Sequence, residues 1–137
     1  MKKLAVGASA VMVLFAAAGS AVAHHSFAMF DHSRSVTLKG EVTKFQWTNP
    51  HAILEIDVPE AKGPQHFTLE LTSINMMQRV GWRSNFIKAG DRVKAVMAPL
   101  VNGGHGGLLL EITLADGRTL QLPVPAAGTF KRSPEAE

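Results

Sequence analysis

Cysteine is absent from the 137 residues of the chain. The protein therefore forms no disulfide bond, carries no lipid-modified cysteine and has no thiol nucleophile. The common sequence signatures of enzymes are missing as well, because no glycine-rich phosphate loop precedes a helix and no HExxH sequence occurs. We expect a domain that is stabilised by its packed core and that is not an enzyme.

Long hydrophobic runs are few. The run from Leu4 to Ala18 has 15 residues, follows a basic start and precedes the small residues Ala21 and Ala23. This order is typical of a cleaved signal peptide, and the run is shorter than the roughly 20 residues that span a bilayer. We predict a signal peptide at residues 1–23, a mature protein that is periplasmic or secreted, and no membrane span after processing.

Excess charge of one sign is also missing from the predicted mature chain. The whole chain has 14 basic and 11 acidic residues, and removal of Lys2 and Lys3 leaves 12 against 11. Nucleic-acid binding usually needs a clustered basic face, so we expect no nucleic-acid partner. The 114 residues that follow position 23 suffice for one domain with a single core.

Apolar and polar residues alternate with a period of two in several segments, as in half-buried strands. In the first, residues 36–42, the apolar residues have even numbers, whereas Phe45 and Trp47 have odd ones. This change predicts a bulge or bend near Thr43 and Lys44. Two further strands are predicted from inward-facing Ala52, Leu54, Ile56 and Val58, and from Phe67, Leu69 and Leu71 with His66, Thr68, Glu70 and Thr72 outward.

A short helix is predicted from Ile74 to Val80, with Ser73 as its N-cap and Gly81 in a left-handed C-terminal position. We expect Trp82 to fold back onto Met77, and Met76 and Met77 to pack in the core. Three more strand segments follow, which contain Val93, Ala95 and Met97, then Leu108, Leu110, Ile112 and Leu114, then Leu120 and Leu122.

The order of three strands, one short helix and two or three strands predicts a mainly β fold. It fits a small OB-like Greek-key barrel of five to six strands at residues 36–123, with the helix between strands three and four. Residues 24–35 are predicted to form an N-terminal arm, and residues 124–137 a flexible tail. A flat sheet with one helix on a face is the alternative.

Six histidines all follow the predicted cleavage site, and neutral imidazole is a common ligand for copper and zinc. As a new N-terminus, His24 would offer a metal ion its amine and its ring. One further imidazole in the same plane would complete a three-nitrogen site that suits Cu(II). His51 is the first choice for this nitrogen, followed by His25 and His105. The alternative is that these histidines are solvated polar residues.

The segment from Trp47 to Ala52, which contains Asn49, combines aromatic and polar residues at a predicted turn. Such a loop at the mouth of a barrel can contact a partner through Trp47 and Asn49. The alternative is structural, with Trp47 closing the core and Asn49 bonding to its own backbone.

Two blocks, AHHSF at 23–27 and WTNPHA at 47–52, together with VTLKGEV at 36–42, make the chain resemble a family of small exported proteobacterial proteins. That family is known only as a domain of unknown function, so the resemblance implies no activity and no ligand set. It places His24, His25 and His51 within the two most distinctive blocks. Family members commonly have Ser-Pro-Asn at the helix start, where this chain has Ser73, Ile74 and Asn75.

Three functional hypotheses follow from these patterns. The first is an exported, non-enzymatic binding protein that holds copper or another transition metal through His24, His25 and His51. The second is a metal-free interaction module that binds an envelope protein or a glycan through the Trp47 loop. The third, an oxidoreductase with a copper site, has no evident substrate surface to support it.

Overall fold

A computed structural model describes residues 27–124. Six strands and one short helix follow the arm, in the order β1 (Val36–Gln46), β2 (Ile53–Val58), β3 (Gln65–Glu70), α2 (Ile74–Arg79), β4 (Arg92–Pro99), β5 (Gly106–Thr113) and β6 (Thr119–Gln121). The predicted signal peptide, His24, His25 and all but the first residue of the predicted tail lie outside the described residues. No helix within residues 27–124 is long and apolar enough to cross a membrane.

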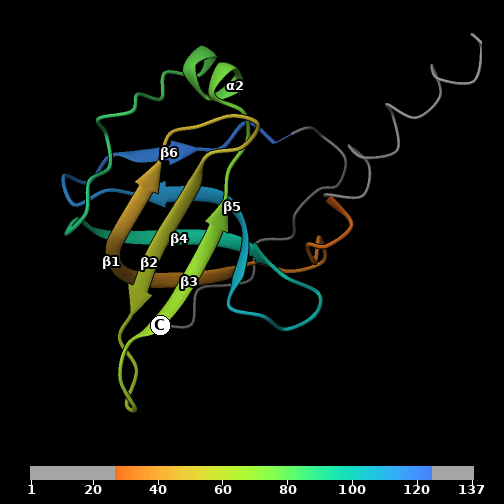
Figure 1. Ribbon diagram of the computed structural model, residues 1–137, viewed down its shortest axis with the longest axis vertical. Helices are drawn as coiled ribbons and strands as arrows, with labels where there is room; N and C mark the ends of the chain where they lie inside the picture. Colours follow the sequence, from red (N-terminus) through yellow and green to blue (C-terminus); the bar gives the residue numbers. More distant parts are fainter. Residues whose placement is uncertain (1–26, 125–137) are drawn as a thin grey trace, which may run out of the picture.

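The sheet closes into a barrel of five strands (Figure 1). Its strands pair in the order β3-β2-β1-β4-β5, and β5 then pairs in parallel with β3, while β6 is added to the free edge of β5. The helix α2 connects β3 to β4 and lies across one end of the barrel in Figure 1. This arrangement confirms the predicted OB-like fold and excludes the flat sheet.

The bend of β1 is produced by a register shift in its pairing with β2. The pairing changes between Val42 and Lys44, as the parity change in the sequence predicts. One extra residue on β1 lets Val42 face the core and moves Phe45 toward the same interior. The first half of β1 pairs with β4 and the second half with β2, so the bend wraps the sheet into the barrel.

Glycine is required where β5 closes the barrel. A Cβ atom on Gly107 would lie 2.3 Å from the carbonyl oxygen of Ala98, and one on Gly106 would lie 2.7 Å from that of Thr68. Since β4 and β3 approach β5 from its two sides, no side chain fits at these positions.

The helix has the predicted caps. Ser73 accepts a hydrogen bond from the backbone N–H of Met76, and Gly81 has a φ of 94°. Trp82 folds back with its backbone N–H donating to the carbonyl of Met77, and its ring is 1% exposed. The indole Nε1 donates to the carbonyl oxygen of Gln121 at 2.9 Å and so ties the helix end to β6.

Two predictions about side chains are wrong. Thr72 is buried rather than outward, because the chain leaves β3 and passes beneath α2, where its hydroxyl donates to the sulfur of Met76. Met76 is 36% exposed and does not pack in the core as Met77 does. In β5 the pairing with β4 shifts between Val96 and Met97, and Leu109 is fully buried whereas Leu110 is only partly buried.

Candidate functional site

A pocket of about 180 Å³ lies between the N-terminal arm and the closure of the barrel. Its wall comes from the arm, from β2 and β3, and from the loop and first residues of β5, namely Met29, Phe30, Ile53, Thr68, Glu70, Leu100, His105, Gly106 and Gly107. The arm, orange in Figure 1, runs beside the blue-green loop that precedes β5.

The arm is fixed to the barrel by both side chains and backbone. Phe30 is 3% exposed and forms an isolated β-bridge with Leu100. The backbone N–H of Asp31 donates to the carbonyl of Pro99 at 2.8 Å, and that of Val101 donates to the carbonyl of Met29 at 3.0 Å. The chain segment that leads back to His24 therefore starts at the edge of the pocket.

A local turn stabilises the end of the arm. The Asp31 carboxylate accepts hydrogen bonds from the hydroxyl and the backbone N–H of Ser33 and from Nε of Arg34. These bonds, those from Ser33 first, lower the pKa of Asp31 to about 2. The carboxylate is thus ionised at neutral pH and holds the turn into β1.

His51 lies directly before β2, and its ring contacts a carboxylate on the neighbouring strand. Its Nδ1 is 2.5 Å from Oε1 of Glu70. The backbone causes this approach, because Ala52 pairs with Leu71 and Thr72 while Ile53 lies opposite Glu70. Glu70 also lines the pocket, so its side chain connects His51 to that wall.

His105 reaches the same pocket from the loop before β5. Its ring lies 5.3 Å from that of Phe67 between centroids, and its carbonyl accepts the backbone N–H of Thr68 at 3.2 Å. Of the predicted metal-ligating residues, His105 thus lines the pocket directly, and His51 is connected to it through its contact with Glu70. The other two, His24 and His25, lie outside the described residues.

A second contact between a histidine and carboxylates lies on the outer face of β2 and β3. Nδ1 of His66 is 2.7 Å from Asp57, and its Nε2 is 3.7 Å from Glu55. Between Phe27 and Val124 no group of three or more His, Asp and Glu side chains is arranged to hold a metal ion. A metal at His51 would therefore need donors from the preceding chain segment.

The two residues predicted to contact a partner have structural contacts. The ring of Trp47 packs edge-on against Phe45 with 5.8 Å between centroids. The side-chain oxygen of Asn49 accepts a hydrogen bond from the backbone N–H of Ile74, the first residue of α2. These contacts give the Trp47 loop a role in joining β1 to the helix, and partner binding through it stays a prediction.

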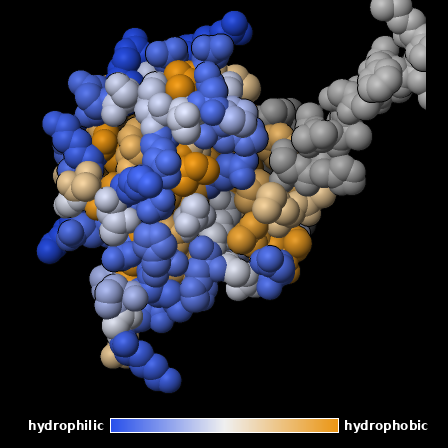
Figure 2. Space-filling view, viewed as in Figure 1, coloured by the Kyte–Doolittle hydropathy of each residue, from blue (hydrophilic) through white to orange (hydrophobic). Residues whose placement is uncertain are grey.

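Of the residues that line the pocket, sequence reasoning singled out only His105, and the contributors that it missed include Glu70 and Met29. Glu70 was expected on an outward strand face, but its contact with His51 depends on strand register. Met29 is 44% exposed beside Val101, and Figure 2 shows apolar residues gathered at the side of the barrel where the arm lies. Residues in an arm without sequence periodicity give no signal of this kind.

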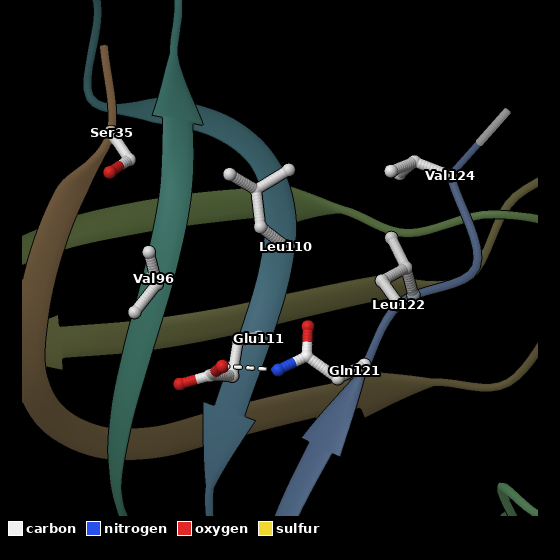
Figure 3. A pocket seen from close by; sticks show the side chains of 7 residues that line it. All are labelled: Ser35, Val96, Leu110, Glu111, Gln121, Leu122 and Val124. Atoms are coloured by element: carbon white, nitrogen blue, oxygen red, sulfur yellow. Dashed lines mark hydrogen bonds between the residues drawn. The ribbon is translucent and has the colours of Figure 1, made fainter. Parts of the chain in front are cut away.

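A larger pocket of about 230 Å³ lies over β4, β5 and β6 (Figure 3). The partly buried side chain of Leu110 lies on this face between Val96 and Leu122, and the amide of Gln121 donates to Glu111 at its rim. It contains no histidine, and none of the predicted site residues lines it.

One solved structure with a similar fold is a mitochondrial single-stranded DNA binding protein from S. cerevisiae, Rim1. The identity is 11%, the match covers 59% of this chain and 92% of that one, and the TM-score is 0.46. The prediction of no nucleic-acid partner is contradicted by this finding, because the neighbour is named a single-stranded DNA binding protein. A likeness at this level assigns no ligand.

The match to known families is more extensive. The curated proteins contain no significant match to the chain. A family of unknown function, DUF6152, matches residues 11–110, which is well over half of the sequence. The match includes both blocks on which the family resemblance rests. The chain belongs to this family of unknown function, DUF6152.

Proposed function

We propose that this is an exported periplasmic binding protein that holds one copper ion at the N-terminus left by signal-peptide cleavage. The amine and ring of His24 supply two nitrogens, and His51 supplies the third. His25 and His105 are the next candidates for that position. One observation carries the proposal. The arm is anchored beside a pocket that Glu70 also lines, and Glu70 contacts His51.

The length of the intervening chain is compatible with this site. Met29 lines the pocket, and His24 precedes it by five residues. An extended chain advances at most about 3.6 Å per residue, which gives His24 a reach of up to about 18 Å from Met29. Because Met29 and Glu70 line the same pocket of about 180 Å³, this reach includes the surroundings of His51.

The donor set favours copper over harder metals. Imidazole and amine nitrogens bind transition metals, and a planar nitrogen arrangement suits Cu(II). A carboxylate-rich site would favour calcium or magnesium. On β2 and β3, however, Glu70 contacts the ring of His51 and Asp57 contacts the ring of His66. The nitrogen donors for the metal would therefore come from the N-terminal His24 and from the ring nitrogen of His51 that Glu70 does not contact.

The proposal is tested with mature protein beginning at His24 and a matched variant that carries one additional N-terminal residue. Copper-loaded mature protein should show one Cu(II) per chain, with nitrogen hyperfine structure in electron paramagnetic resonance. The extended variant, which has lost the six-membered chelate formed by the terminal amine and the ring of the same histidine, should bind more weakly. Equal affinities for the two proteins would refute a role for the terminal amine.

Histidine substitutions then locate the third nitrogen. His51→Ala should remove one nitrogen from the spectrum, whereas His66→Ala, on the outer face of the sheet, should leave it unchanged. A spectrum that changes with His105→Ala and not with His51→Ala would identify His105 as the ligand.

A further inference from the structure

The contact between Glu70 and His51 has the geometry of a carboxylate that orients a metal-ligating imidazole. Oε1 of Glu70 lies 2.5 Å from Nδ1 of His51, and the two side chains are 25% and 37% exposed. Among the described residues, Nε2 of His51 makes no hydrogen bond. One ring nitrogen is thus engaged by a carboxylate and the other is open.

The engaged nitrogen determines where the ring proton resides. An ionised carboxylate only accepts hydrogen bonds, so Nδ1 must be the donor in this contact. In a neutral ring the other nitrogen then carries a lone pair and is the one that can bind a metal ion. Histidine ligands in metal sites commonly donate their second nitrogen to a carboxylate in this way.

Glu70 is held on a rigid part of the barrel. It is the last residue of β3, paired on one side with Ile53 of β2 and on the other with Leu108 of β5. The backbone of Glu70 is therefore held from both sides, and its carboxylate contacts the His51 ring from a fixed strand position.

We infer that Glu70 is a positioning residue that holds His51 in the Nδ1–H tautomer and presents Nε2 to a transition metal ion. This inference rests on the proposed function and adds a residue that neither the family match nor the sequence pattern identifies. It also predicts which nitrogen binds. His66 with Asp57 provides a matched pair of similar geometry that is separate from the pocket.

The first test uses metal-free protein and long-range ¹H–¹⁵N correlation spectra, which distinguish the two neutral histidine tautomers. His51 should be the Nδ1–H form in the wild type, and Glu70→Gln should shift it toward the Nε2–H form. Asp57→Asn should affect His66 and leave His51 unchanged. A wild-type His51 protonated at Nε2 would overturn the inference without any use of copper.

The second test measures Cu(II) affinity by competition with a chelator. Loss of a carboxylate that orients a ligand typically weakens metal binding by about 10- to 100-fold, and we expect this effect from Glu70→Gln. In a His51→Ala background the same substitution should cause no further loss, because its effect acts through the imidazole. Circular dichroism melting shows whether each variant is folded.

The outcomes separate this inference from the proposed function. If wild type binds copper at His24 and Glu70→Gln binds equally tightly, the positioning role is wrong and the proposed function stands. If wild type binds no copper, the proposed function fails and the inferred metal role of Glu70 fails with it. The tautomer measurement then still decides whether Glu70 sets the ring proton of His51.

Discussion

Phe30 is the residue whose removal should most directly detach the arm from the barrel. Its side chain is 3% exposed and belongs to the hydrophobic core, although it lies outside the six named strands. Truncation of a buried phenylalanine to alanine costs about 3–5 kcal/mol. Because Phe30 packs at the edge of the core and its neighbourhood can relax, we expect Phe30→Ala to lower the free energy of unfolding by about 3 kcal/mol.

Urea unfolding followed by the fluorescence of the two tryptophans measures this loss, since Trp82 is buried and reports on the barrel. Met29→Ala is the matched control, because its side chain is 44% exposed and its substitution should cost less than about 1 kcal/mol. Hydrogen exchange at the amide of Val101, which donates to the carbonyl of Met29, should accelerate in Phe30→Ala. A loss below about 1 kcal/mol with unchanged exchange would refute the anchoring of the arm.

Three further predictions concern the barrel and the arm. Gly107→Ala should destabilise the fold by about 1–3 kcal/mol in chemical denaturation, because the new methyl group would meet the Ala98 carbonyl oxygen. The control Gly104→Ala should cost clearly less, because its methyl group would meet only side-chain atoms. Trp82→Phe should cost about 2 kcal/mol in thermal unfolding, since the Gln121 carbonyl loses its donor, and a change below about 0.5 kcal/mol would contradict the role of that bond. The folded-state pKa of Asp31, about 2, is below its usual value of 3.8, so its stabilising effect is complete above about pH 4 and is lost as the pH falls through about 2. An NMR titration of its carboxyl carbon with a midpoint near 3.8 would show that the turn with Ser33 is not formed.

The sequence predicts the parts of the fold that depend on local patterns. The parity change after Val42 predicts the bulge in β1, and Ser73 and Gly81 predict the ends of the helix, because each signal lies in the residues that form the feature. The shift in β5 was not predictable in this way. Leu108, Leu109 and Leu110 are consecutive and equally apolar, so they have no alternation that reveals which one leaves the core.

The candidate site was predictable only in part, because it depends on which strands become neighbours. His51 stands out in its sequence block, but its contact with Glu70 arises from the antiparallel register in which Ile53 faces Glu70. The approach of the arm to the loop before β5 depends on the β-bridge between Phe30 and Leu100, 70 residues apart in the sequence. Such long-range pairing has no local signal.

The central claim is that export creates a metal-binding N-terminus beside His51. Its most direct test is native mass spectrometry of the protein recovered from the periplasm of cells supplied with copper. We predict a single species that begins at His24 and carries one copper ion. A different N-terminus, or a species that begins at His24 and carries no metal, would contradict the account.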